Sequence, residues 1–251
     1  MAKLSVVLAT YNEEENIEEC LKSVKDIADE ICIVDGTSDD KTVSIAKKYT
    51  SKIIVTDNPQ IFHINKQKAI DMASNDWILQ LDADERVSAD LAAEIKEIIK
   101  SNPRENGYWI PRKNWFLGRF LMKGGQYPDY TLRLYRTGQG RLPMKDVHEQ
   151  AIVDGSVGYL KHPLIHIADP KFNRYLKRFN RYTSLMAVQI QKDKNLKNPL
   201  IFFRYLIFYP LKWFMLTYLR HKGFMDGWQG FVFSLFSALR FPVSYIKGVL
   251  I

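Results

Sequence analysis

Cysteine is scarce in this sequence, with only Cys20 and Cys32 among 251 residues. The two do not have the C-x-x-C spacing of a zinc site or a redox motif, so neither kind of site is predicted. A disulfide is not predicted either, because such bonds are rare outside oxidising compartments. We expect both cysteines to be buried as small apolar side chains.

Several targeting and repeat patterns are also missing. There is no internal repeat, no low-complexity linker and no signal peptide pattern, since Met1-Ala2-Lys3 leads directly into the apolar segment Leu4–Ala9. From this we expect a cytoplasmic protein. The length and the 46% hydrophobic content predict one catalytic domain with a real core and a C-terminal extension.

A glycine-rich phosphate loop is absent after the first apolar segment. Thr10-Tyr11-Asn12-Glu13-Glu14 follows that segment, and it is acidic and contains no glycine. Nucleotidyltransferases, which place acidic metal ligands on an α/β sheet, normally carry a basic, glycine-rich loop after the first strand. The sequence therefore disfavours that enzyme class, which stays as an alternative.

The first hundred residues alternate between strand and helix patterns. Apolar runs of strand length are followed by segments with helical spacing, such as Ile17, Leu21 and Val24. The predicted strands are 4–9, 30–35, 53–55 and 77–81, and the predicted helices include 17–24 and 65–73. This alternation predicts an α/β fold with a parallel sheet covered by helices on both faces.

Polar residues follow three of these strands. Thr10, Asp35 and the pair Asp82 and Asp84 all come at carboxyl ends, where ligands of such sheets bind. Two carboxylates that share one strand end repel each other unless a cation lies between them. Because Mg²⁺ and Mn²⁺ bind through one or two carboxylates plus substrate phosphates, Asp82-Ala83-Asp84 predicts a metal-bound nucleotide diphosphate. Taken alone, the motif would fit a solvated acidic turn.

These motifs together resemble family 2 glycosyltransferases, which are GT-A fold enzymes that use nucleotide sugars. The resemblance is closest to the lipopolysaccharide core, WaaE-like branch, and it extends from residue 4 to about residue 230. The motifs that carry it are Ser5–Glu13, Val34–Asp35 with Ser38, Asp40 and Thr42, Ala69–Trp77, Leu79–Glu85, Val147–Glu149 and Lys222–Gly227. Two positions depart from the branch: Gly36 comes one residue early, and Asn65-Lys66-Gln67 replaces Gln-Lys-Asn.

The resemblance implies roles at the donor end of the site. Asp84 would be the first metal ligand for Mn²⁺ or Mg²⁺, and Asp82 would contact the ribose or assist the metal. Asp35 would accept the uracil N3–H, which favours UDP, although a cap on the following turn explains it too. Lys66 would face the diphosphate, with an exposed helix lysine as the alternative. The other donor-binding residues would be Thr10, Glu13, Tyr11, which would stack on the base or lie in the core, and Ala83.

The second half of the sequence must supply a base for inverting transfer, which removes the proton of the acceptor hydroxyl. Glu149 is the candidate, with Asp129 and Asp146 as alternatives. His166 follows an apolar strand pattern and either completes the metal site or is an ordinary core histidine. Arg133 either meets an anionic acceptor or forms a surface salt bridge.

The C-terminal third differs in composition from the rest. Residues 171–251 contain 14 Lys and Arg but only Asp193 and Asp226 as acids, and 15 of the 32 aromatic residues lie in 202–245. Basic, aromatic helices of this kind predict a membrane-surface segment, in which Arg204, Lys212, Arg220 and Lys222 would face anionic headgroups. The apolar runs disfavour nucleic acid, and a subunit interface in a homo-oligomer is the alternative. A membrane span is not predicted, because Arg204, Pro210 and Lys212 interrupt the first run.

These observations predict a catalytic domain over 1–168 and a helical membrane region over 169–251. Within the domain, 1–100 would bind the nucleotide sugar and 101–168 the acceptor, with Gly124–Pro128 as a mobile acceptor loop. The expected activity is metal-dependent, inverting transfer of a sugar from a UDP-sugar to a lipid-linked glycan, such as lipopolysaccharide core, at the inner face of the cytoplasmic membrane. A polyprenyl-phosphate glycosyltransferase is the alternative within the class, and a membrane-binding module would not explain the three aspartates.

Overall fold

The computed structural model describes residues 2–59, 61–143, 150–193, 196 and 198–250. The chain divides into two compact units, each with its own hydrophobic core. The first unit comprises Met1–Arg112 and Asp129–His166, and the second comprises Lys113–Pro128 and Ile167–Ile251. Residues 113–128 thus leave the first unit between two of its strands, which the sequence did not predict.

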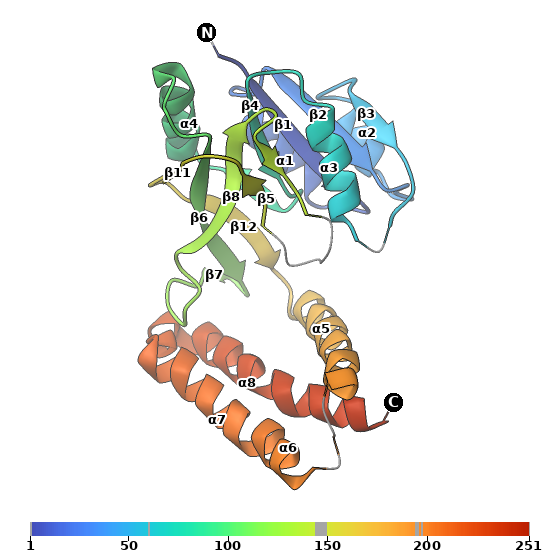
Figure 1. Cartoon of the computed structure of the whole chain (residues 1–251), viewed down its shortest axis with the longest axis vertical. Helices are drawn as coiled ribbons and strands as arrows, with labels where there is room; N and C mark the ends of the chain where they lie inside the picture. Colours follow the sequence, from blue (N-terminus) through green and yellow to red (C-terminus); the bar gives the residue numbers. More distant parts are fainter. Residues whose placement is uncertain (1, 60, 144–149, 194–195, 197, 251) are drawn as a thin grey trace. The chain divides into compact units, whose positions relative to one another are not determined.

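The first unit begins with alternating strands and helices (Figure 1). They are β1 (Leu4–Thr10), α1 (Ile17–Val24), β2 (Glu30–Asp35), α2 (Thr42–Ala46), β3 (Ile53–Val55), α3 (His63–Asp71) and β4 (Trp77–Leu81). The four strands are parallel in the order β3-β2-β1-β4. This confirms the predicted α/β class, and the carboxyl ends of the four strands form one edge of the sheet.

Further strands, most of them in antiparallel pairs, extend this sheet beyond β4. The next elements are β5 (Glu85–Val87), α4 (Ala89–Ser101), β6 (Gly107–Phe116), β8 (Asp129–Arg136), β11 (Val157–Tyr159) and β12 (Leu164–Asp169), with β9 (Gly140–Arg141) and β10 (Ile152–Val153) as a separate pair. The sheet order continues from β4 through β8, β6 and β12 to β5. Because β12 pairs antiparallel with β5, it brings His166 opposite Glu85.

Burial on both faces explains the apolar character of β1. Val6 and Leu8 point into one core cluster and Val7 into the other, and none is more than 1% exposed. Such a strand is apolar throughout because helices cover both faces of a parallel sheet. Cys20 and Cys32 are fully buried, as predicted, and both are free thiols.

The second unit is mainly helical. It contains β7 (Arg119–Phe120), α5 (Phe172–Asp193), η3 (Gly223–Asp226), α8 (Gly227–Leu250) and a continuous helix formed by α6 (Pro199–Phe203), η1 (Arg204–Phe208), α7 (Tyr209–Phe214) and η2 (Met215–Arg220). In η1 and η2 this helix widens to π geometry, with the amide of Tyr209 donating to the carbonyl of Arg204. Aromatic rings pack within this unit, Phe116 at the end of β6 on Tyr175 of α5 and Tyr205 of η1 on Tyr245 of α8.

The continuous helix Pro199–Arg220 has 22 residues, and by length and composition it is the one helix in the described residues that is able to cross a membrane. Only 6% of its most apolar 18-residue stretch is buried. The residues expected to interrupt it, Arg204, Pro210 and Lys212, lie within the helix without ending it.

Candidate active site

The first two strand ends meet through their side chains. Thr10 and Asp35 are paired in register at the ends of β1 and β2, and the Thr10 hydroxyl donates to Asp35 Oδ2 at 2.8 Å. The backbone N–H and the hydroxyl of Ser38 each donate to the same carboxylate at 2.7 Å. Asp35 is fully buried. This geometry fits the alternative interpretation of Asp35, in which its carboxylate caps the following turn. The contact of Asp35 with the uracil of the donor stays a prediction.

Asp82, directly after β4, lies between two cations. Lys66 of α3 forms an ion pair with Asp82 Oδ1, and Arg133 of β8 donates to Oδ2 at 2.6 Å. Burial raises the pKa of the Asp82 carboxyl, but the charges of Arg133 and Lys66 outweigh it and hold this pKa well below its usual range. Lys66 is 7% exposed and Arg133 8%, so neither is the surface residue that the alternative interpretation described.

Glu85 connects Asp82 to a second arginine. Its side chain is 0% exposed, and it accepts the Asp82 backbone N–H at 2.9 Å, Arg133 Nη2 at 3.0 Å and Arg112 Nη1 at 3.3 Å. Arg112 also donates to Asp129 Oδ2 at 2.7 Å. Buried charges need such partners, because an unpaired one loses its hydration without compensation. The network fixes the backbone of the Asp82–Glu85 turn.

Asp84 points away from this network toward β12. Its Oδ2 lies 3.5 Å from Nε2 of His166, and both side chains are about one-seventh exposed, at 16% and 14%. A carboxylate and an imidazole at this separation fit two adjacent ligands of one divalent cation. In the described part of the chain no group of three or more His, Cys, Asp and Glu side chains could hold a metal. The pair fits a cation that also takes oxygens from a diphosphate.

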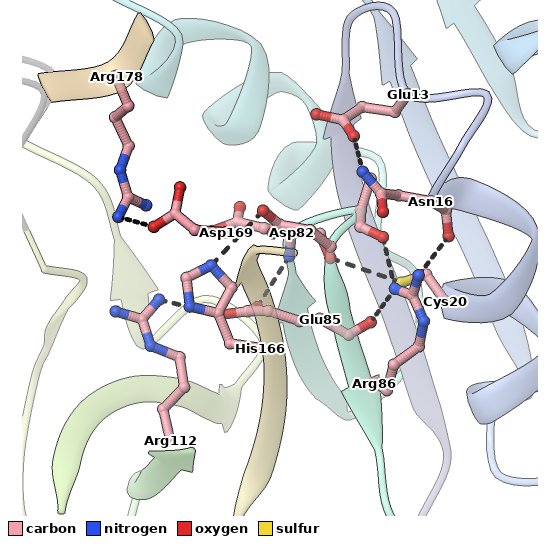
Figure 2. Close-up of polar contacts among 12 residues, drawn as sticks. Glu13, Asn16, Cys20, Asp82, Glu85, Arg86, Arg112, His166, Asp169 and Arg178 are labelled. Carbon is pink, nitrogen blue, oxygen red and sulfur yellow. Dashed lines mark hydrogen bonds and ion pairs between the residues drawn. The ribbon is translucent and has the colours of Figure 1, made fainter. Parts of the chain in front are cut away.

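Arg86 holds the same turn through backbone carbonyls. Its guanidinium donates to the carbonyls of Ala83 at 2.7 Å, Glu85 at 2.8 Å and Asn16 at 2.8 Å, and Figure 2 shows it reaching from the turn to Asn16. Ala83 itself is 4% exposed and its methyl group packs in the core. Any contact of Ala83 with a donor would therefore involve its backbone.

Tyr11 and Glu13 lie on the loop after β1. Tyr11 is 47% exposed, so it is not the core residue of its alternative interpretation, and its ring is available for stacking. Glu13 accepts the side-chain amide of Asn16 at 2.7 Å, which Figure 2 also shows, and its backbone N–H donates to Thr42 at 2.7 Å. The loop is therefore anchored by its own hydrogen bonds.

The predicted base lies outside the described residues. Glu149 and its alternative Asp146 both fall in 144–149, so their placement does not enter the geometry of the site. The other alternative, Asp129, is described and is engaged by Arg112 through both Nε and Nη2. Both hydrogen bonds go to Oδ2, and a carboxylate paired with a guanidinium is a poor proton acceptor because the positive charge favours its ionised form. The geometry thus weakens Asp129 as a base.

Sequence reasoning missed Glu85, Arg86 and Arg112 as parts of the site. Glu85 was visible next to Asp82-Ala83-Asp84, but its burial depends on β8 and β6, which supply Arg133 and Arg112 from more than 25 residues away. A charged residue directly after a paired-carboxylate motif was the available signal. The two arginines had no local pattern that distinguished them from surface arginines.

Comparison with known proteins gives a family and relatives. Residues 5–152 match the family described as "Glycosyl transferase family 2". The chain is 29% identical over 251 residues to an uncharacterized glycosyltransferase of Rickettsia typhi, covering 95% of this chain and 84% of that protein. It is 28% identical to the "Lipopolysaccharide core biosynthesis glycosyltransferase LpsC" of Rhizobium meliloti, covering 94% of this chain and 88% of that protein.

A solved structure supports the fold. The mannosyltransferase PcManGT from Pyrobaculum calidifontis, described in complex with GDP-Man and Mn²⁺, superposes with a TM-score of 0.54 at 15% sequence identity. The alignment covers 99% of this chain and 87% of that one. The GT-A fold predicted from the resemblance is confirmed, and so is the resemblance to lipopolysaccharide core enzymes among the relatives.

Proposed function

This chain belongs to glycosyl transferase family 2, and from that premise we propose that it transfers a sugar from a UDP-sugar to a lipid-linked glycan at the inner face of the cytoplasmic membrane. The observation that carries the proposal is the arrangement at the end of β4. There Asp84 lies beside His166, and Asp82 lies between Lys66 and Arg133. This is a site for a cation and a diphosphate on the edge of the sheet where nucleotides bind.

The reaction exchanges one bond at the anomeric carbon for another. The acceptor hydroxyl oxygen bonds to that carbon, while the bond to the diphosphate oxygen breaks and its electron pair leaves with the nucleoside diphosphate. The hydroxyl proton passes to a carboxylate, for which Glu149 is our candidate. A divalent cation held by Asp84 and His166, Mn²⁺ or Mg²⁺, would supply positive charge to the leaving diphosphate.

Lys66 has a second partner in this scheme. Its ammonium now neutralises Asp82, which Arg133 also contacts. A diphosphate would compete for Lys66, and Arg133 would keep Asp82 ionised when that lysine moves. Because both cations are buried, their positive charges are in place before the donor binds and are weakly screened by water.

Attachment to an anionic membrane surface is part of the proposal. Arg204, Lys212, Arg220 and Lys222 are all exposed in the second unit. The first three are eight residues apart on one helix, and an exposed apolar row runs beside them: Phe203, Ile207, Leu211, Met215 and Leu219. A helix lying in the interface would bury that row while the cations meet headgroups.

A spanning helix would place the charged side chain of Lys212 within the hydrocarbon, which costs free energy. The relative named for lipopolysaccharide core biosynthesis supports a lipid-linked acceptor.

A thermal-shift experiment tests the donor site. We would measure unfolding of the full chain with UDP-sugars and GDP-sugars, with and without Mn²⁺, because a ligand that binds the folded form raises its stability. A UDP-sugar with Mn²⁺ should raise the melting temperature by about 5 °C or more at saturating concentration. The shift should disappear in Asp84→Asn and persist in Asp90→Asn, an exposed aspartate of α4 that serves as the control. If no nucleotide sugar shifts the wild type, the proposed donor class is wrong.

A further inference from the structure

The segment Lys222–Gly227, which follows the long helix of the second unit, forms a turn, and glycine is required at two positions in it and at Gly230 in the first turn of α8. Gly227 has φ +68°, a conformation in which other residues are strained. A Cβ on Gly223 would come within 2.7 Å of the Thr217 carbonyl oxygen, and one on Gly230 within 1.9 Å of the Gly223 carbonyl oxygen. The helix end and the start of α8 are therefore in backbone contact, and the turn between them has one tightly packed conformation.

The turn also binds the loop Leu121–Pro128, which follows β7. Asp226 is 3% exposed, and its Oδ2 accepts the backbone N–H of Lys123 at 2.7 Å. The backbone N–H of Gly124 donates to the carbonyl of His221 at 2.9 Å. These two hydrogen bonds attach the predicted acceptor loop to the turn within the same unit. The loop is fixed where it meets the turn, rather than free along its length.

The same turn exposes large apolar side chains. Phe224 is 50% exposed, Met225 is 52% and Trp228 is 60%. Arg220, His221 and Lys222 are exposed next to them, while the acid of this turn, Asp226, is buried. A rigid turn that buries its acid and exposes two aromatic rings, a methionine and three basic side chains is not explained by packing within the unit.

We propose that the segment Arg220–Trp228, which contains this turn, inserts into the interface of an anionic phospholipid bilayer and holds the loop Leu121–Pro128 at that interface. Aromatic rings are enriched at the level of the headgroups, and lysine and arginine beside them gain about 1 kcal/mol each from anionic lipids. The inference rests on the proposed membrane attachment, and it assigns that attachment a specific anchor and gives the acceptor loop a position.

Charge favours lipid over a protein partner. Phe224, Met225 and Trp228 are exposed beside three basic side chains, and the exposed apolar row of the long helix ends at Leu219, directly before Arg220. Inserted in a bilayer, the same three side chains need no shaped partner, because the acyl region is fluid and apolar. The basic residues match lipid phosphates, which are present at high density on such a surface.

Co-sedimentation of the full chain with vesicles tests the anchor. Vesicles of phosphatidylcholine with 30% phosphatidylglycerol, on the order of physiological anionic content, would be compared with pure phosphatidylcholine. Phe224→Ser with Met225→Ser should lower partitioning about tenfold or more, and Lys222→Gln about fivefold. The control is Ile54→Ser with Val55→Ser, which removes two apolar side chains of matching exposure, 46% and 55%, from β3. It should leave partitioning unchanged.

A label on the loop tests its position. An environment-sensitive fluorophore on Gln126→Cys would be used, since Cys20 and Cys32 are buried. Its emission should shift to the blue when vesicles are added, and Asp226→Ala should reduce that shift while co-sedimentation stays within about twofold, because the exposed apolar side chains remain. An unshifted label in the vesicle-bound wild type would overturn the placement of the loop.

The outcomes separate the anchor from the wider proposal. If the wild type binds anionic vesicles and Phe224→Ser with Met225→Ser binds equally well, the anchor is wrong and the attachment stands. If the wild type does not bind vesicles and elutes as a tight oligomer, both the proposed membrane attachment and the anchor are wrong. Neither result affects the donor site, which the thermal-shift experiment tests alone.

Discussion

The strand-end site of the first unit and the long helix of the second use charge in opposite ways. In the first unit, Lys66, Arg112 and Arg133 are at least partly buried, and each contacts a carboxylate. In the second unit, Arg204 and Lys212 are exposed on a helix whose first and last turns contain no acidic residue. A buried cation requires a partner, while an exposed one keeps its hydration and can meet an external anion.

This difference shows why composition alone misleads. Arginine and lysine occur in both units, but burial decides whether such a side chain pairs with a carboxylate in a site or stays hydrated on the surface. At the buried charges of the first unit the expected consequence of a charge change is lost catalysis or lost stability. At the exposed cations of the long helix the same change should leave folding almost unaltered and weaken binding to lipid.

The largest effect is expected at Asp84, whose carboxylate lies 3.5 Å from the imidazole of His166. Asp84→Ala should lower transfer at least about 10³-fold, because the charge that develops on the leaving diphosphate loses its counterion. EDTA should inactivate the wild type, and added Mn²⁺ should restore it. Full turnover in chelator would contradict the metal assignment. The control is Asp90→Ala, at an exposed position of α4.

A comparable loss, but in stability, is expected at Glu85. Glu85→Ala removes one of the two carboxylates that contact Arg133 and one of the two that contact Arg112, while Asp82 and Asp129 remain. Loss of one partner of a buried charge typically costs about 3–5 kcal/mol, and the remaining carboxylates should keep the loss near about 3 kcal/mol. Urea denaturation would measure the loss. Glu97→Ala, at an exposed position of α4, should cost less than about 0.5 kcal/mol. A change at Glu85 below about 1 kcal/mol would show that the two arginines are well solvated.

Glu149→Gln tests the base. The amide has nearly the same size but cannot accept a proton, so kcat should fall roughly 10²-fold with donor binding little changed. Asp129→Asn should act differently, since Asp129 is bonded to Arg112, and its main effect should be on stability. If Asp129→Asn loses turnover and Glu149→Gln keeps it, the assignment of the base must be exchanged.

A moderate, pH-dependent effect is expected at Glu30 of β2. Burial raises its pKa, but hydrogen bonds from Lys52, Ser5 and Ser74 outweigh this and lower it from 4.5 to about 2. A depressed carboxyl pKa stabilises the folded state above the unfolded value and loses that contribution as the pH falls from about 4.5 toward 2. Glu30→Gln should therefore cost about 2 kcal/mol at pH 7 and progressively less below pH 4.5. A cost that does not vary with pH would exclude this ionic origin.

The smallest effect on folding is expected on the long helix. Neutralising Arg204, Lys212 or Arg220 singly should change stability by less than about 0.5 kcal/mol, since each is exposed. Each change should nevertheless weaken binding to anionic vesicles by about fivefold at low salt, and less as salt rises. Equal weakening on neutral vesicles would show that packing, not charge, holds the helix at the membrane.

The parallel half of the fold was predictable because its signals are local. Leu4–Ala9 predicted β1, and the spacing of Ile17, Leu21 and Val24 predicted α1, since a buried strand or helix face requires apolar residues at fixed intervals. The segment 113–128 lies in the range predicted as the acceptor half, whereas the structure groups it with the helical unit. Its partners, His221 and Asp226, are about a hundred residues away, and no local pattern encodes such a pairing.

The candidate site divides in the same way. The sequence by itself placed Thr10, Asp35, Asp82 and Asp84 at strand ends, because the ends of parallel strands form one edge. It also supplied the family, which the match over residues 5–152 confirms. It did not show that Lys66 is buried against Asp82.

Only the tertiary structure decided which charges are buried and paired. Glu85 is completely buried because β8 and β6 bring two arginines to it, and His166 faces Asp84 because β12 pairs with β5. Pairing of this kind joins residues that are far apart in the chain, and its energy depends on the water excluded around them. A linear pattern contains the residue types, whereas the dielectric environment that gives them their roles exists only in the folded protein.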